Sequence, residues 1–475
     1  MIKKISITAS ILILIISIFA IKDIKNGREK SISKYLPDDL KILLKKTIFI
    51  VPTLHKKIED QNNLIEELKV EKIKTLATWK DISRNSIENI SFKKVFSTDL
   101  KISNKKYKFE KFLMPLPDYY TWKKKSVGYL DHKDNYIYFV SGDGYIFRSY
   151  DSNFENKQNI RFKQIKSNIL NFLDKNTLKA GKISIKDILI KNNKIYISYN
   201  FEKKKDCFNV QIVSGELNDN YISFIDFFSY DECYGNKELH SSGGRIVNYS
   251  ENEILFSLGE GLNRRLAQNK DSIFGKILKI DLITQKYKII SMGHRNPQGL
   301  YYDRSSNLIF STEHGPSGGD EININLNNYT TIPNFGWPIS SYGEHYPGKI
   351  TRLKAEGKLN ELLEEAPLNK SHKDFGFVEP LKYFTPSIGI SEIIKLPNNI
   401  ETNLKDIFIV AAMGLNIDEG DKSLHYFHLD EKNKIKNINY TVIGERVRDL
   451  IYYKNSNSLL MILENTPALG VINLN

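Results

Sequence analysis

The chain has 475 residues, of which 41% are hydrophobic and 26% charged, a composition typical of a folded globular protein. Two cysteines exclude a zinc site built on several thiolates. The net charge of +13 indicates either attraction to anionic partners or lysines spread over a solvated surface. No finger-like, helix-turn-helix or RNA-recognition pattern accompanies it, so we expect no nucleic-acid partner.

The N-terminal segment predicts a membrane anchor. Lys3 and Lys4 precede seventeen uncharged residues, Ile5 to Ile21. At about 1.5 Å per residue this helix approaches the thickness of the hydrocarbon layer. The positive flank holds the N-terminus in the cytoplasm, which sends the rest of the chain outward. We therefore expect residues 1–24 to be an uncleaved signal anchor, with a cleaved signal peptide as the alternative, and the remaining chain to lie in the periplasm or outside the cell.

Residues 25–90 are polar and rich in lysine and glutamate. Ile58, Leu64, Leu68 and Ile73 recur at a loosely helical spacing, which predicts a partly helical stalk.

From residue 91 to 475 the pattern changes to β-strands and repeats itself. Each copy is a strand, a polar turn and a second apolar strand. When the copies are aligned, equivalent positions in the second strands are Ile137, Ile195, Ile254, Leu308, Ile407 and Leu459. Successive intervals are 58, 59, 54, 99 and 52 residues, so one interval carries an insertion. Six hairpins with room for two further strands each predict an all-β, six-bladed β-propeller, and a β-sandwich is the alternative.

We place the insertion at about residues 341–375 and expect TRLKAEGKLNELLEEA within it to form a short helix on a surface loop. Cys207 and Cys233 lie 26 positions apart. Outside the cytoplasm they could form a disulfide across neighbouring strands, and two free thiols are the alternative.

Polar residues gather at one position of the repeat. In an antiparallel hairpin, the start of the first strand and the end of the second lie at the same edge. Residues at these positions should therefore converge on the mouth of the central channel, which the innermost strands line. They are His240, Glu260, Arg295, Asn296, His314, Gly315, Pro316, Asp320, Arg446 and Arg448.

These residue types suit redox chemistry on a polar ligand. The arginines could hold several carboxylates through forked hydrogen bonds. Carbonyl oxygens of Gly315 and Pro316, with the Asp320 carboxylate, suit a calcium ion. His240, oriented by Glu260, is a candidate general base that takes a hydroxyl proton while a hydride leaves for an acceptor. Taken singly, each residue also has a structural interpretation, such as a salt bridge between blades.

The motifs GHRNPQGL, STEHGPSGGDEIN, NFGWPISSYGEHY, HSSGGRI and ERVRDL resemble those of the soluble quinoprotein glucose and aldose sugar dehydrogenases, the glucose/sorbosone dehydrogenase family. The resemblance implies a six-bladed propeller that binds pyrroloquinoline quinone (PQQ) and calcium and oxidises aldoses at the anomeric carbon. It also implies a periplasmic electron acceptor.

By this resemblance His240 is the catalytic base and Glu260 its carboxylate partner. The resemblance places Arg295, Asn296, His314, Asp320, Arg446 and Arg448 around the quinone. It places the carbonyls of Gly315 and Pro316 on the calcium ion.

Several positions of this chain differ from the family pattern. Leu239 stands where an aspartate is usual, Glu260 stands where aspartate is typical, and HSSGGRI carries one residue more than expected. Two further differences affect the quinone site. TLKAGKISIKDILI lacks the expected glutamine, and Met413 and Gly414 stand where a lysine is expected. A non-catalytic propeller that binds a glycan or a protein at the same mouth is therefore the alternative function.

Overall fold

The computed structural model describes residues 89–116, 127–151, 154, 158–173, 185–234, 241–397 and 406–475. The chain divides into two compact units, Met1–Thr75 and Leu76–Asn475, and every described residue belongs to the second. The expected anchor and stalk lie outside the described residues, apart from residues 89 and 90. Within the described ranges, no helix has the length and apolar character needed to span a bilayer.

The fold is built from antiparallel sheets, four of which have four strands each. The first contains β7 (Ile185–Lys191), β8 (Lys194–Lys204), β9 (Cys207–Glu216) and β11 (Ile225–Phe228). The second contains β12 (Gly243–Asn248), β13 (Glu253–Leu258), β14 (Lys276–Asp281) and β15 (Tyr287–Met292). The third contains β16 (Pro297–Asp303), β17 (Leu308–Glu313), β18 (Asp320–Asn325) and β19 (Lys382–Phe384). The fourth contains β20 (Ile390–Lys395), β21 (Phe408–Ala412), β22 (Ser423–Leu429) and β23 (Ile435–Val442).

The remaining strands form a ten-stranded sheet. One end holds β3 (Gly128–Lys133), β4 (Tyr136–Ser141), β5 (Ile146–Tyr150) and β6 (Asn159–Ser167), with β10 (Tyr221–Ile222) parallel to β6. The other end holds β24 (Val447–Tyr453), β25 (Ser458–Leu463) and β26 (Ala468–Asn473). Between them lie β1 (Asn89–Ile102) and β2 (Lys105–Leu113), where β1 pairs with both β2 and β6.

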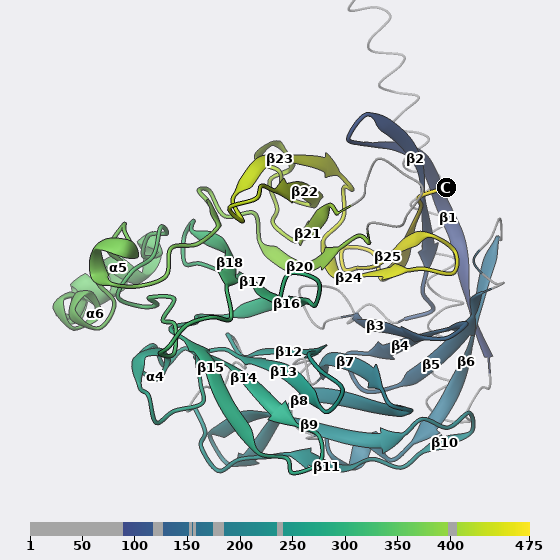
Figure 1. The fold of residues 1–475 in the computed structure, drawn as a ribbon, viewed down its shortest axis with the longest axis horizontal. Coiled ribbons are helices and arrows are strands. Elements are labelled where there is room, and N and C mark those ends of the chain that lie inside the picture. Colours follow the sequence, from purple (N-terminus) through teal and green to yellow (C-terminus); the bar gives the residue numbers. More distant parts are fainter. Residues whose placement is uncertain are drawn as a thin grey trace, which may run out of the picture. The chain divides into compact units, whose positions relative to one another are not determined.

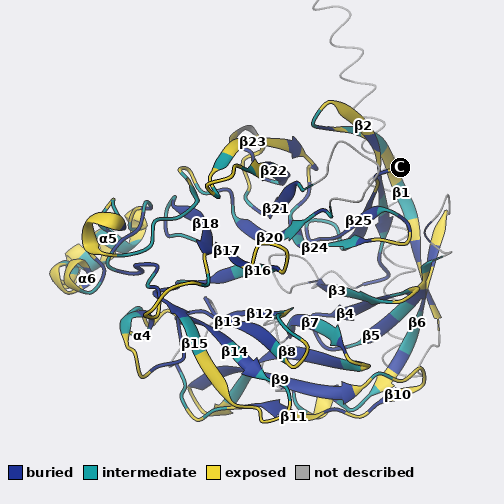
Figure 2. Ribbon diagram, in the orientation of Figure 1, coloured by how far each residue is buried: buried dark blue, intermediate teal, exposed yellow. Residues whose placement is uncertain are grey.

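The first strands of the hairpins contact one another in a closed order, β3–β7–β12–β16–β20–β24–β3 (Figure 1). Buried apolar clusters fill the spaces between successive sheets; one of them joins β4 to β7 and β8, and another joins β17 to β20 and β21. Because each sheet is covered on both faces, β25 (SLLMIL) is buried at every residue, whereas the outer strand β23 is largely exposed (Figure 2). The chain is therefore all-β, and this arrangement fits a propeller.

The N-terminal strands close the ring, which the repeat did not predict. β2 pairs with β26 from Lys108↔Asn473 to Leu113↔Ala468. The last sheet thus takes its fourth strand from the start of the domain. Pairing an early strand of the domain with the last strand leaves fewer unpaired strand edges, which are sites of aggregation.

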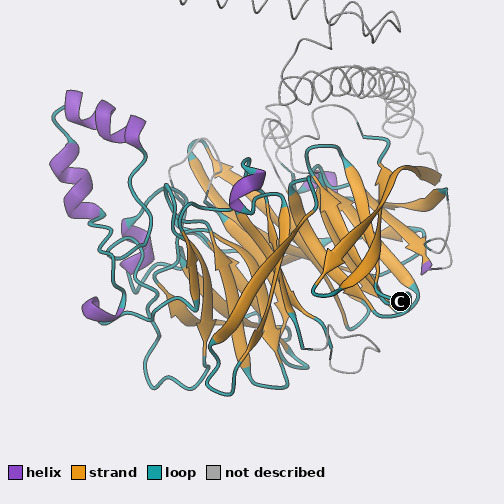
Figure 3. Cartoon of the chain, turned by 90° about the horizontal axis from the view of Figure 1, so that it is seen from above, coloured by secondary structure: helices purple, strands orange, loops and turns teal. Residues whose placement is uncertain are grey.

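The predicted insertion lies in the connection between β18 and β19. It contains two helices, α5 (Pro347–Ala355) and α6 (Leu359–Glu365), where we expected one (Figure 3). Gly357, at φ +69°, lies between them. A left-handed residue ends an α-helix, so the single expected helix is divided.

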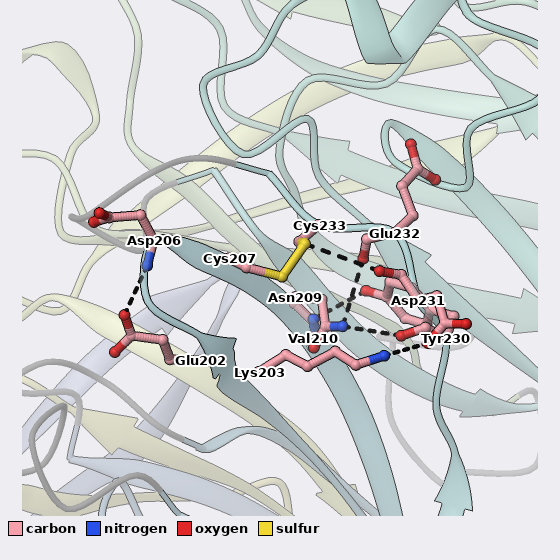
Figure 4. Close-up of a disulfide and its surroundings, with 10 residues drawn as sticks. All are labelled: Glu202, Lys203, Asp206, Cys207, Asn209, Val210, Tyr230, Asp231, Glu232 and Cys233. Carbon is pink, nitrogen blue, oxygen red and sulfur yellow. Dashed lines mark hydrogen bonds and ion pairs between the residues drawn. A yellow bond between two sulfur atoms is a disulfide. The ribbon is translucent and has the colours of Figure 1, made fainter.

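Cys207 and Cys233 form a disulfide, which selects one of the two alternatives (Figure 4). Cys207 begins β9, and the adjacent Phe208 forms an isolated bridge with Tyr234. Side-chain Nδ2 of Asn209 also donates to the carbonyl of Tyr230 at 3.2 Å. The disulfide therefore fixes the segment 230–234 to the start of β9.

We predict that replacing both Cys207 and Cys233 by serine lowers the free energy of unfolding by about 3 kcal/mol, because a loop of this length regains its entropy in the unfolded chain. Denaturant unfolding under non-reducing conditions measures the difference. Reductant should bring the wild-type protein close to the double variant and leave the variant unchanged. Equal stability of the two proteins without reductant would contradict the prediction.

Candidate functional site at the rim of the first strands

The hairpins end in the same way. Five of the six hairpins are described on both sides of this edge. In each of them, the backbone N–H just after the second strand donates to the carbonyl just before the first strand. The pairs are Gly142–Val127, Gly259–Ser242, His314–Asn296, Met413–Gly389 and Glu464–Arg446, at 2.7–3.3 Å. We call this edge of the first strands the rim. Its residues come from separate sheets, as the hairpin geometry predicts.

Five of the six first strands, all but β3, share a second feature, a register shift near their start. It lies between Ile185 and Asp187 in β7, and equivalent shifts occur in β12, β16, β20 and β24. A β-bulge turns the extra residue out of the regular alternation. The residues at the shift in β7, β16 and β24 are Lys186, Gln298 and Arg448.

A buried guanidinium joins four of the first strands beneath the rim. Arg245 Nη1 lies 3.2 Å from Asp187 Oδ1, 2.8 Å from Glu392 Oε2 and 2.7 Å from Asp449 Oδ1. Arg245 also donates to the carbonyls of Gln298 and Arg448, at 2.7 and 3.0 Å. We call Arg245, Asp187, Glu392 and Asp449 the ionic hub.

The ionic hub holds more negative than positive groups, since one guanidinium faces three carboxylates. Burial raises the pKa of Asp187 to about 7 and that of Glu392 to about 8, against the opposing effect of Arg245. The hub therefore retains protons at neutral pH, which lowers the cost of burying its carboxylates together.

Two rim arginines, Arg448 in β24 and Arg446 just before it, share one carboxylate. Arg448 Nε and Nη2 bind the two oxygens of buried Glu464, at 2.6 and 3.2 Å. Arg446 Nε lies 3.5 Å from Glu464 Oε2, and its Nη1 donates to the Met413 carbonyl. Glu464 thus neutralises one of two positive charges, and the pair keeps a net positive charge.

Arg448 is connected to the neighbouring hairpin through amides. Its Nη1 donates to Gln298 Oε1 at 3.0 Å, and Gln298 Nε2 donates to Asn296 Oδ1 at 3.0 Å. The Asn296 carbonyl in turn accepts from the backbone N–H of His314. Three of the predicted site residues, Arg448, Asn296 and His314, therefore belong to one continuous network that Gln298 completes and that spans two sheets.

Arg295 links this network to the ends of the hairpins β12–β13 and β16–β17. Its Nη1 donates to the His314 carbonyl at 2.7 Å, and its guanidinium lies 5.3 Å from the Trp337 ring centre. Its own carbonyl accepts from the N–H of Glu260 at 2.9 Å. Arg295 and Glu260 are therefore neighbours at the rim.

Buried polar atoms without a hydrogen-bond partner occur in this part of the described chain. They are Arg295 Nε, His314 Nε2 and Glu260 Oε2. Burial raises the pKa of Glu260 despite the nearby Arg295, and burial lowers the pKa of His314 despite Asp320. Unpaired buried groups cost folding free energy, so they indicate a site that a polar ligand completes.

The turn after the fourth hairpin is fixed by Asp320. One carboxylate oxygen accepts from the N–H of Gly315 at 3.0 Å, and the other accepts from Ile390 at 2.9 Å. A Cβ on Gly315 would come within 2.2 Å of the Gly319 carbonyl, so the turn requires glycine there. Within the described ranges, the carbonyls of Gly315 and Pro316 accept no hydrogen bond, and no cluster of three or more His, Cys, Asp or Glu side chains suits a metal.

A buried network supports this turn from below. His294 Nδ1 contacts Glu313 Oε1 at 2.5 Å, and Glu313 Oε2 accepts from the N–H of Arg295. Asn323 Nδ2 reaches both Glu313 and Glu321 at 3.2 Å, and His372 from the insertion lies 3.4 Å from Glu321. The network therefore holds the backbone at Arg295 and at the end of β17, just before the Gly315–Pro316 turn.

His240 lies outside the described residues, so its predicted position beside Arg295 and Arg448 stays a prediction. The adjacent Ser241 is described, and its carbonyl accepts from the N–H of Gly261 at 2.8 Å. The chain at position 241 thus runs beside the chain that carries Glu260.

Sequence reasoning missed several residues at the rim. Glu464 directly follows the sixth hairpin, so the rule that selected Glu260 and His314 could have found it. Gln298 stands in the quoted GHRNPQGL motif. For Lys186 no signal was available, because the bulge that displaces it depends on pairing with β8.

Comparisons with known proteins identify the family of this chain. The family model for glucose/sorbosone dehydrogenase matches residues 182–469, and the chain belongs to that family. The aldose sugar dehydrogenase YliI of Escherichia coli is 36% identical over 128 residues, which is 24% of this chain and 33% of YliI. An uncharacterised Synechocystis protein is 26% identical over 231 residues, 44% of this chain and half of that protein. These relatives are thus matched over half their length or less.

Solved structures show the same fold. A glucose dehydrogenase crystal structure aligns over 73% of this chain and 95% of its own, with a TM-score of 0.55 and 19% identity. The apo-form of the soluble aldose sugar dehydrogenase of Escherichia coli aligns over 74% and 97%, also with a TM-score of 0.55, at 18% identity.

The ionic hub generates a prediction about pH. The pKa values of Asp187 and Glu392 lie above their unfolded values near 4, so folding takes up protons. Their contribution to stability is complete below about pH 4 and declines as pH rises through 7 and 8. Because Glu392→Gln keeps a neutral group there, its stability should fall less than that of wild type between pH 5 and 9. Denaturant unfolding at each pH measures this.

Glu216→Gln is the matched control, since Glu216 is exposed at the end of β9. It should reproduce the wild-type decline. If the stability of Glu392→Gln fell with pH as steeply as that of wild type and Glu216→Gln, then Glu392 would not be a group that takes up protons on folding.

Proposed function

We propose that this protein is a quinoprotein dehydrogenase that oxidises an aldose-type sugar, with PQQ and calcium bound at the rim of a six-bladed propeller. Membership of the glucose/sorbosone dehydrogenase family supports a sugar dehydrogenase. The observation that carries the proposal is the network joining Arg448, Asn296, His314, Arg295 and Glu260 across separate sheets.

The rim residues fit an anionic quinone. PQQ carries several carboxylates, and the rim offers the guanidinium groups of Arg295, Arg446 and Arg448 to bind them. The unpartnered Arg295 Nε is one donor that such a ligand would satisfy.

Calcium would be held by the carbonyl oxygens of Gly315 and Pro316, which no other group occupies in the described chain. Asp320 contributes by shaping this turn, since both its oxygens already accept backbone N–H groups.

If bound at the rim, PQQ would supply a quinone as the hydride acceptor, and calcium on the Gly315 and Pro316 carbonyls would supply Lewis-acid polarisation. His240 takes the proton of the C1 hydroxyl, so the sugar loses two electrons and two hydrogens and becomes a lactone. Arg295 and Arg448 hold the anionic partner in position, and Glu260 orients the base.

We also propose that residues 1–24 anchor the protein in the membrane, with the propeller in the periplasm or outside the cell, where an electron acceptor is available. The apolar segment Ile5–Ile21 supports the anchor. The Cys207–Cys233 disulfide supports an oxidising compartment.

A non-catalytic propeller that binds a glycan or a protein partner is the second candidate. One observation favours it: Glu464 already occupies the fork of Arg448. The third nitrogen, Nη1, donates to Gln298, so a forked carboxylate contact from PQQ would have to share or displace these contacts.

The test uses the full chain purified in detergent with added PQQ and calcium. We expect quinone absorbance that stays with the protein, and reduction of a dye by one or more members of an aldose panel. Neither absorbance nor turnover would contradict the proposed dehydrogenase and favour the binding propeller.

We predict that His240→Ala lowers turnover by at least about 100-fold, because a general base is lost, and leaves PQQ uptake intact. Dye reduction and retained quinone absorbance measure the two effects. His428→Ala, an exposed histidine in β22, is the control and should retain activity. Full activity of His240→Ala would remove this residue from the mechanism.

A further inference from the structure

Lys186 is displaced from the regular pattern of β7. Ile185 pairs with Tyr199 and Asp187 pairs with Ser198, so Lys186 is the extra residue of a bulge. Asp187 belongs to the ionic hub, and Ile185 lies one step nearer the rim. Lys186 therefore stands between the hub and the rim, at the level of Gln298 and Arg448 in their own strands.

The stem of Lys186 rests on the neighbouring strand β12. A Cβ on Gly244 would come within 2.5 Å of Lys186 Cβ and 2.9 Å of its Cγ, and Gly244 has φ +112°. Any side chain at 244 would take the space of the lysine stem. The course of the stem is thus set by the backbone of the next sheet and not by a partner of the amine.

The charges around Lys186 are positive. Its electrostatic neighbours are Arg448 and Arg245, which belong to β24 and β12. Among the described residues, Lys186 Nζ has neither an ion pair nor a hydrogen bond, although the side chain is only partly exposed. Burial, followed by these two guanidinium groups, lowers the pKa of Lys186 to about 7.

The nearby acids are already engaged. Glu464 holds Arg448 and Arg446, and the three carboxylates of the ionic hub hold Arg245. An amine placed among cations without an acid of its own costs folding free energy. A carboxylate delivered by a ligand would remove that cost.

We propose that Lys186 is an anion-binding residue at the base of the rim, where its amine receives a carboxylate group of the bound ligand. The naming of PQQ as that ligand rests on the proposed function; the chemistry of the site requires only a carboxylate. With Arg448, Lys186 then forms a cationic pair contributed by two sheets.

The test compares PQQ affinity of the full chain in detergent, measured by quenching of tryptophan fluorescence, for wild type, Lys186→Met and Lys186→Arg. Methionine keeps the packing on Gly244 and removes the charge. We expect Lys186→Met to weaken binding by about tenfold or more and Lys186→Arg to weaken it less. Lys191→Met is the matched control, because Lys191 lies at the other end of β7 and binds Asn248 and Ser250; it should bind PQQ as wild type does.

Acetylation with acetic anhydride, followed by mass spectrometry, provides a second readout on wild-type protein. Bound PQQ should protect Lys186 at least tenfold and leave Lys191 unprotected. Equal PQQ affinity of wild type and Lys186→Met, with no protection of Lys186, would overturn the role of Lys186 and leave the proposed dehydrogenase standing.

If wild-type protein binds no PQQ, the proposed function fails, and the same acetylation experiment is read with citrate as a carboxylate probe. Protection of Lys186 by citrate would then support an anion-binding residue. Absence of protection at saturating citrate would overturn it.

Discussion

The ring of first strands depends on one buried guanidinium. Arg245 contacts Asp187, Glu392 and Asp449 and the carbonyls of two further residues, so it joins β7, β16, β20 and β24 to its own strand β12. Removing Arg245 would leave these carboxylates without a positive partner in the interior, and loss of one partner of a buried ion pair costs about 3–5 kcal/mol. The cluster therefore specifies how far apart the strands stand as well as stabilising them.

The rim inherits its geometry from this cluster. Bulges just beyond the hub turn Lys186, Gln298 and Arg448 out of the strand alternation. The hairpin ends add Arg295, His314 and Glu464, and the pairing of Glu464 with two arginines limits the local repulsion. The rim thus carries fixed guanidinium groups on a rigid base, a preorganised arrangement that needs little reorganisation to receive an anion.

Much of the fold could be read from the repeat, because hairpin strands are local and their apolar residues alternate. Ile137, Ile195, Ile254, Leu308 and Leu459 all lie in the second strand of a hairpin, and Ile407 directly precedes β21. Closure by β2 and β26 could not be read this way, since it joins residues more than 350 positions apart. The division of the insertion into α5 and α6 depended on one left-handed glycine.

For the site, the sequence determined which residues reach the rim, because position within a hairpin fixes the edge at which a residue lies. Arg295, Asn296, His314, Arg446 and Arg448 were found by that rule. Only the tertiary structure decided what these residues bind: that Glu464 takes the fork of Arg448, that both oxygens of Asp320 serve backbone N–H groups, and that Lys186 has cations for neighbours. Such pairings form between strands of different sheets, so they follow from the closed ring and from no local pattern.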